Sequence, residues 1–185
     1  MALILVRHTR TLAVDGRCIG RAEVALAPTF AEEAATVAGR VGRPDRIVTS
    51  PIGRCQRLAE AIGRHFDMSV AADADWAEMD FGRWQGRAWA DIPRAEVALW
   101  AGDFLDARPH GGESVAMLLA RIRRALNGVR ALPGRTLAVT HEGAIRAALV
   151  ATGAGDAAWR REIGHGEAVD VAPAAAFPAA DAGRA

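Results

Sequence analysis

Two short apolar runs in this sequence each lead into a histidine. Residues 3–6 precede Arg7 and His8, and residues 137–139 lie two positions before His141. Short runs of aliphatic and β-branched side chains predict buried strands, so each imidazole is expected where a strand gives way to a turn. Ligands of open α/β sheets bind at that edge. The pattern therefore predicts two histidines and an arginine at one sheet edge, where they suit an anionic ligand.

Strand and helix signals alternate along the chain, which is the pattern of an α/β domain with a mainly parallel sheet. We expect strands over 3–7, 46–49, 69–72 and 136–140, and helices over 31–40, 54–66, 114–131 and 143–152. The helix over 114–131 has the clearest apolar period and a candidate cap in Ser114. Its arginines are expected on a solvated face; they are Arg121, Arg123, Arg124 and Arg130. The stretch 76–112, with four tryptophans and many turn formers, is a candidate lid.

Length and composition narrow the fold and the partners. A chain of 185 residues is enough for one well-buried core, so we expect one domain over 1–172 and an Ala/Pro-rich tail over 173–185. We expect the end, 172–185, to close the sheet as an edge strand and then to fray. The formal charge of +1 gives no reason to expect a nucleic-acid or acidic-lipid partner.

Other composition features bear on compartment and chemistry. No segment approaches 18 uninterrupted apolar residues, so we expect no membrane span and a cytoplasmic protein. Cys18 and Cys55 have no cysteine framework around them, so we expect two reduced thiols. The chain contains no lysine, and all 23 basic residues are arginine. That composition excludes Schiff-base chemistry and the lysine of a P-loop. Arginine offers planar, bidentate donors to phosphate or carboxylate oxygens.

The sequence contains the groups that hydrolysis of a phosphate monoester needs, which are a nucleophile, a cationic cradle and an acid for the leaving oxygen. His8 is the candidate nucleophile, and Arg7 beside it pairs with phosphoryl oxygens and disfavours the imidazolium. Arg54 follows a turn from strand to helix, where backbone N–H groups also face an anion. Glu78, among apolar residues that raise its pKa, is the best candidate acid. Glu113 fits better as a carboxylate at a helix N-terminus.

Two rival phosphatase classes fail on spacing. A cysteine phosphatase needs an arginine six positions after its cysteine, but Val24 follows Cys18 at that distance and Ala61 follows Cys55. A zinc site calls for closely spaced ligand pairs, and none of the five histidines stands within four residues of another. We therefore expect neither a metal nor a cofactor.

Five segments, taken together and in order, resemble the histidine phosphatase, or phosphoglycerate mutase-like, superfamily. They are LVRHT at 5–9, SPIGR at 50–54, EMDFGRWQG at 78–86, GGES at 111–114 and VTHEG at 139–143, and they cover about residues 3–150. The resemblance implies a three-layer domain with helices on both faces of the sheet, metal-independent chemistry and a phosphohistidine intermediate. It also implies roles for five residues. His8 is the nucleophile, Glu78 is the proton donor that later activates water, and the phosphoryl oxygens are bound by Arg7, Arg54 and His141.

Several positions depart from the common pattern of that superfamily. Thr9 replaces a glycine, and a branched side chain is tolerated there only if the backbone avoids positive φ. Glu142 also stands where glycine is usual. Further departures are Arg10, Val14, Gln56-Arg57-Leu58 and Gln85. These changes bear on substrate choice and packing more than on the reaction.

Residues 18–21 (CIGR), followed by Glu23 and Leu26, resemble a segment of the α-ribazole phosphatases of cobalamin synthesis. We therefore favour a phosphomonoester hydrolase acting on the small molecule α-ribazole 5′-phosphate, because a mutase needs longer inserted loops than this chain has room for. A phosphoglycerate mutase-type phosphotransferase, a broad sugar-phosphate phosphatase and a non-catalytic phosphate-binding regulator are the alternatives. The oligomeric state is left open, with a homodimer as one alternative.

The remaining histidines and the tryptophans have no comparable context. His65 is expected on a helix surface, and His110 and His165 are expected in loops, with His110 a candidate lining residue of the pocket. Tryptophans are expected to pack in the interior. Trp84 is a candidate wall of the site.

Overall fold

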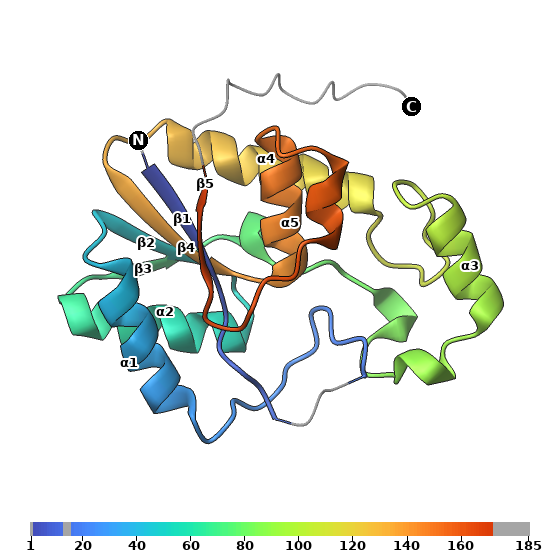
Figure 1. The fold of residues 1–185 in the computed structure, drawn as a ribbon, viewed down its shortest axis with the longest axis horizontal. Helices are drawn as coiled ribbons and strands as arrows, with labels where there is room; N and C mark the ends of the chain where they lie inside the picture. Colours follow the sequence, from blue (N-terminus) through green and yellow to red (C-terminus); the bar gives the residue numbers. More distant parts are fainter. Residues whose placement is uncertain (1, 13–15, 172–185) are drawn as a thin grey trace.

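The sheet of this protein is five-stranded, with the strand order β3-β2-β4-β1-β5 (Figure 1). A computed structural model describes residues 2–12 and 16–171. The strands are β1 (Ala2–Arg7), β2 (Arg46–Thr49), β3 (Val70–Ala72), β4 (Arg135–Thr140) and β5 (Ala168–Val171). Neighbouring strands run parallel except β5, which is antiparallel to β1. The mainly parallel sheet predicted from the sequence is confirmed.

The register of β1 against β4 explains how two distant histidines meet. Arg7 is paired with Thr140, so His8 and His141 are the next residues on neighbouring parallel strands. The backbone N–H of His8 still donates to the carbonyl of Thr140, at 3.0 Å. Both imidazoles therefore leave the sheet at its carboxyl edge, where ligands of such sheets bind.

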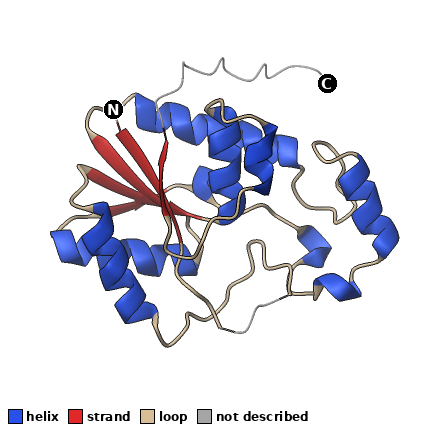
Figure 2. Ribbon diagram, in the orientation of Figure 1, coloured by secondary structure: helices blue, strands red, loops and turns tan. Residues whose placement is uncertain are grey.

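Helices cover both faces of the sheet, as Figure 2 shows. On one face α1 (Phe30–Val41) and α2 (Gly53–Phe66) pack on alternate strand residues such as Val6 and Val139. On the other face α4 (Val115–Arg130) and α5 (Glu142–Ala151) pack on Leu5 and Ala138. Strands buried on both sides read as continuous apolar runs, which accounts for the sequence of β1 and β4. The three-layer prediction is confirmed.

A long excursion between β3 and α4 contains mostly short elements. It includes three 3-10 turns, η1 (Ala74–Trp76), η2 (Gly82–Trp84) and η3 (Trp89–Asp91), and one helix, α3 (Arg94–Gly102). A fourth 3-10 turn, η4 (Asp156–Arg160), follows α5. The sequence did not predict α3, because the helix buries none of its residues and so has no apolar stripe to signal it. Figure 1 shows α3 at one end of the molecule, away from the sheet.

Several expectations about individual segments can now be compared with the structure. Ser114 caps α4, since its hydroxyl accepts from the backbone N–H of Met117 at 3.1 Å. The expected solvated face of α4 is wrong for Arg121, which is buried at 6 % exposure. The edge strand beside β1 is β5, which ends at Val171, whereas the strand predicted over 172–185 lies outside the described residues. No helix in the described ranges is long and apolar enough to cross a membrane.

Candidate active site

The His8 imidazole is held as a neutral ring with one lone pair free. Its Nδ1 lies 2.8 Å from the carbonyl oxygen of Thr9, and a carbonyl only accepts, so Nδ1 carries the proton and Nε2 does not. Burial, followed by the charges of Arg54 and Arg7, lowers the pKa of His8 from 6.5 to about 3. Thr9 is not among the described residues with positive φ, so its branched side chain fits the turn without strain.

His141 lies at the end of β4, fully buried and 5.3 Å from His8 between ring centroids. Its Nδ1 is 3.1 Å from Arg54 Nη2, and its Nε2 is 2.8 Å from the hydroxyl of Ser50. Because arginine only donates, Nδ1 accepts and Nε2–H donates to Ser50. Burial and the charge of Arg54 hold the pKa of His141 well below its usual value, in agreement with a neutral ring. The buried thiol of Cys55 packs 3.3 Å from Nε2.

Arg54 lies in the first turn of α2, after the turn that follows β2, and only 3 % of the residue is exposed. Its guanidinium is fixed by two backbone carbonyls, because Nη1 donates to Ala22 at 2.9 Å and Nη2 to Gly20 at 2.6 Å. The segment that resembles α-ribazole phosphatases, residues 18–21, therefore supports this arginine directly. A buried guanidinium held by neutral carbonyls keeps its full charge for an anion.

Arg7 ends β1 and, like His8 and Arg54, lines a cavity at this edge of the sheet. Its Nη1 lies 3.2 Å from a carboxylate oxygen of Glu142 and also donates to the carbonyl of Ile163. The other oxygen of Glu142 pairs with Arg146 at 2.6 Å. Glu142 therefore bridges two arginines at the edge of the anion site. The sequence marked Glu142 as a departure from the family pattern but gave no sign of this bridge.

Glu78 reaches the site from the loop after η1. Its carboxylate accepts from the backbone N–H of Met79 at 2.8 Å and from that of Gly143, in the first turn of α5, at 3.2 Å. A Cβ on Gly143 would overlap the Glu78 carboxylate, so a larger residue there would displace this side chain from its present position. Burial outweighs these bonds and raises the pKa of Glu78. The carboxyl group is therefore biased towards its protonated form, as an acid requires.

A buried ion pair fixes the backbone that carries Glu78. Arg121 binds both oxygens of Glu113, at 2.7 and 2.9 Å, and also donates to the carbonyls of Asp75, Ala77 and Glu78 at 2.7–2.9 Å. All five N–H donors of the guanidinium are thus used. Glu113 stands directly before the N-cap of α4, as expected, and its carboxylate also forms this ion pair with Arg121.

Four of the five predicted site residues, His8, Arg7, Arg54 and Glu78, line one cavity of about 480 Å³, whereas the fully buried His141 does not line it. His165, expected only as a loop residue, also lines it, and its ring centroid lies 5.3 Å from that of His8. Nothing near residue 165 in the sequence signals this, because a loop between η4 and β5 places it there. Two other interpretations are wrong, since Trp84 and His110 do not line the cavity; Trp84 is fully buried and donates to Glu96 at 2.7 Å.

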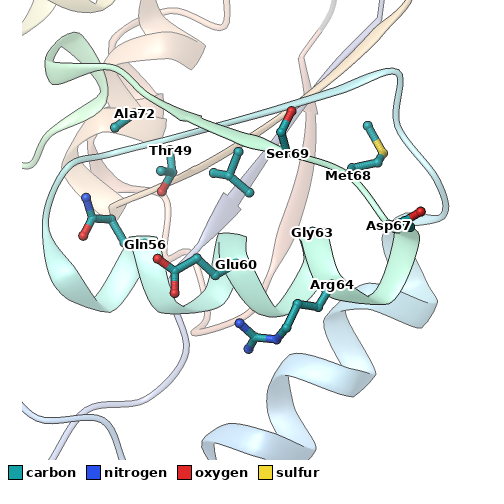
Figure 3. A pocket seen from close by; sticks show the side chains of 10 residues that line it. Thr49, Gln56, Glu60, Gly63, Arg64, Asp67, Met68, Ser69 and Ala72 are labelled. Atoms are coloured by element: carbon teal, nitrogen blue, oxygen red, sulfur yellow. The ribbon is translucent and has the colours of Figure 1, made fainter.

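A second hollow of about 480 Å³ lies between α2 and β3 (Figure 3). Its lining includes Gln56, Glu60, Arg64 and Asp67 but none of the predicted site residues. Only one of the two hollows therefore combines histidines with buried arginine. Among the described residues, no three His, Cys, Asp or Glu side chains gather in a way that could hold a metal ion.

Comparison with known proteins decides the family. The sequence model of the histidine phosphatase superfamily (branch 1) matches residues 3–171. This chain belongs to that superfamily. A probable phosphoglycerate mutase, GpmB of Proteus mirabilis, is 33 % identical over 150 residues, covering 76 % of this chain and 69 % of the relative. A bifunctional protein of Mycobacterium tuberculosis is 33 % identical over 129 residues, covering 66 % of this chain and 35 % of the relative.

Solved structures of the histidine phosphatase fold are also similar to this chain. An α-ribazole phosphatase from Shigella flexneri has a TM-score of 0.79 at 26 % identity, covering 92 % of this chain and 89 % of that one. A mycobacterial glucosyl-3-phosphoglycerate phosphatase has a TM-score of 0.79 at 25 % identity, covering 91 % and 88 %. The chain spans about a third of the length of the first mycobacterial relatives.

Proposed function

We propose that this protein hydrolyses phosphate monoesters through a phosphohistidine formed on His8. The observation that carries the proposal is the state of His8. Its buried imidazole is neutral, its proton is held on Nδ1, and its Nε2 carries a lone pair, in a residue that lines the cavity. Nε2 forms the bond to phosphorus, and the bond from phosphorus to the alcohol oxygen breaks. A nucleophile of this kind splits one difficult displacement into two easier ones.

The guanidinium groups of Arg7 and Arg54 supply the cradle in this proposal. Both line the cavity with His8, and planar donors match the oxygens of a phosphoryl group. As charge spreads over those oxygens in the transition state, preorganised cations stabilise it at no cost in reorganisation. His141 keeps Arg54 oriented through Nδ1, and because its ring is fully buried and does not line the cavity, it acts in this proposal through Arg54.

Glu78 is the proton donor of the proposal, supported by its raised pKa and its place in the cavity. In the first step the carboxyl proton passes to the leaving alcohol oxygen. In the second step the resulting carboxylate takes a proton from water, the water oxygen bonds to phosphorus, and Nε2 of His8 leaves. The products are the alcohol and inorganic phosphate.

We favour α-ribazole 5′-phosphate as the substrate. Support comes from residues 18–21, which resemble the corresponding segment of α-ribazole phosphatases and hold Arg54 through the carbonyl of Gly20. A structural neighbour of that name shares the fold at 26 % identity. Transfer of the phosphoryl group to a second hydroxyl, as in a mutase, is the alternative, and the probable mutase of Proteus mirabilis supports it.

Turnover of p-nitrophenyl phosphate in excess chelator tests the proposal. We expect steady release of phosphate by the wild type and its loss in His8→Ala. His65→Ala is the matched control, because His65 is exposed on α2, and it should keep full turnover. A His8→Ala protein with wild-type turnover would contradict the proposal, and binding without turnover in the wild type would favour a non-catalytic phosphate-binding regulator. Isomerisation of 3-phosphoglycerate without phosphate release would favour the mutase.

A further inference from the structure

Five aromatic rings form a continuous wall of the cavity that contains His8. They are Phe81, Trp89, Trp100, Phe104 and Trp159. Adjacent rings meet edge to face or tilted in the order Trp89, Phe81, Trp100, Phe104 and Trp159, with centroid separations of 5.4 to 6.1 Å. The chain has ten Phe and Trp residues and no Tyr, so half of its aromatic side chains line this one hollow.

These rings differ from the aromatic residues that serve packing alone. Trp76 and Trp84 are fully buried and do not line the cavity, whereas every ring of the wall keeps some exposed surface. Trp89 is 39 % exposed. A large apolar side chain left open to water forgoes part of the stabilisation that burial provides, and open aromatic surface in a cavity is typical of ligand sites. The wall is therefore surface that a ligand can cover.

The proposed proton donor is close along the chain to one ring of the wall, and the leaving alcohol is the group that receives its proton. Glu78, the proposed proton donor, is followed by Met79 and Phe81, and all three line the cavity. Val115 and Leu118 of α4 add aliphatic surface to it. Among the described lining residues the only carboxylates are Glu78 and Glu142, and Glu142 is engaged by Arg7 and Arg146. The lining that follows Glu78 is thus rich in apolar and aromatic surface, and the charged lining residues outside the cradle are Arg17, Arg146 and Glu142.

We propose that this wall is a stacking subsite for a flat aromatic group carried by the alcohol part of the substrate. The substrate class is then a phosphate monoester of an aryl-bearing or nucleoside-type alcohol, rather than a small polar ester such as a phosphoglycerate. The inference rests on the proposed function, because that function determines which end of the cavity holds the phosphoryl group. A benzimidazole nucleoside such as α-ribazole 5′-phosphate belongs to this class, and so do purine nucleotides and simple arylalkyl phosphates.

Matched esters test the subsite because the chemical step is held constant. 2-Phenylethyl phosphate and glycerol 1-phosphate both release a primary alcohol, and only the first carries a ring. We expect kcat/KM to be about tenfold higher for the phenyl ester, since stacking of one ring on aromatic side chains is worth about fivefold to 150-fold. Equal values, or a preference for glycerol 1-phosphate, would overturn the subsite while leaving a phosphatase in place.

Binding of phosphonates separates failure of the subsite from failure of the proposed function. Isothermal titration with 2-phenylethylphosphonate and 2-hydroxyethylphosphonate needs no turnover. We expect the phenyl compound to bind about tenfold more tightly. If no ester is hydrolysed but this ratio holds, the proposed function fails and the subsite stands. If esters are hydrolysed but both phosphonates bind alike, the subsite is wrong and the function stands.

Variants of the wall locate the effect. Trp89→Ala and Trp159→Ala should each bring the ratio of the two dissociation constants at least threefold closer to one, as expected when one stacking partner of several is removed. Leu99→Ala is the matched control, because Leu99 is 65 % exposed on α3 and does not line the cavity. If the ratio of the two dissociation constants is the same in both tryptophan variants as in Leu99→Ala, the assignment of the wall as a stacking subsite is contradicted. Circular dichroism confirms that each variant is folded.

Discussion

Replacing Arg121 by methionine should destabilise this protein far more than the same change at Arg124, although both arginines belong to α4. The side chains of Arg121 and Glu113 are 8 % and 9 % exposed, whereas that of Arg124 is 63 % exposed. Removing one member of a buried pair leaves the other charge unpaired and costs about 3–5 kcal/mol. An exposed pair such as Arg124 with Asp75, at 2.8 Å, contributes about 0–1 kcal/mol.

The structure explains why the cost at position 121 should be at the upper end of that range. Without Arg121, the carboxylate of Glu113 keeps only Arg21, at 3.2 Å, and one backbone N–H among its described partners. The carbonyls of Asp75 and Ala77 lose the donor that the structure gives them. This loss is a large part of the free energy of unfolding of a typical domain, which is about 5–15 kcal/mol.

Urea unfolding followed by circular dichroism measures both variants, with Arg121→Lys as the milder change if Arg121→Met does not fold. Lysine keeps the charge but not the planar set of donors, so it should recover part of the loss. Combining Arg121→Met with Glu113→Gln should cost at least about 1 kcal/mol less than the two single losses together, because the two side chains are coupled. An Arg121→Met protein as stable as Arg124→Met would refute the reasoning.

Four further predictions concern the site. Glu78→Gln should slow hydrolysis of alkyl esters more than that of p-nitrophenyl phosphate, whose leaving group needs little protonation, and equal losses in kcat would count against Glu78 as the acid. Arg54→Ala should weaken inhibition by vanadate by about thirtyfold, equivalent to about 2 kcal/mol for lost charge-assisted bonds, and an unchanged inhibition constant would remove Arg54 from the cradle. Glu142→Gln should instead tighten inhibition by phosphate, because the carboxylate that shares Arg7 loses its charge, and weaker inhibition would show that Glu142 mainly holds Arg7 in place. As pH falls from about 6 to about 4, the unfolded chain takes up a proton on His8 that the folded protein, in which the pKa of His8 is lowered, does not bind. The free energy of unfolding should therefore fall by up to about 1.4 kcal/mol per pH unit from this group. His8→Gln should make the pH dependence of the free energy of unfolding less steep in urea unfolding, and an unchanged dependence would contradict the lowered pKa of His8.

The layers of this fold could be predicted from the sequence because strands buried on both faces read as apolar runs and amphipathic helices have a clear period. The convergence of His8 and His141 followed from parallel strands sharing one carboxyl edge, and the register of Arg7 with Thr140 confirms it. Glu78 was harder, since isolated carboxylates are common. Only the family resemblance singled it out further, and the cavity places it beside His8.

What the sequence could not predict depends on contacts between residues far apart in the chain. Arg121 looked like one of several arginines on a helix surface, and only the packing of α4 against η1 buries it. The position of His165 is set by a loop that returns to β1, where the N–H of Gly166 donates to the carbonyls of Arg7 and His8. The aromatic wall likewise assembles from the segment 76–112, which lacks a period, and from Trp159 in η4. Non-local contacts of this kind have no signature in local sequence patterns.

Direct detection of the covalent intermediate tests the central claim. The enzyme is mixed with p-nitrophenyl phosphate, quenched in alkali, where phosphohistidine survives, and digested for mass spectrometry of the histidine-containing peptides. The account predicts one phosphoryl group on His8, lost on acid treatment and absent from His8→Ala. A phosphoryl group on His141 or His165, or full turnover with no labelled histidine, would contradict it.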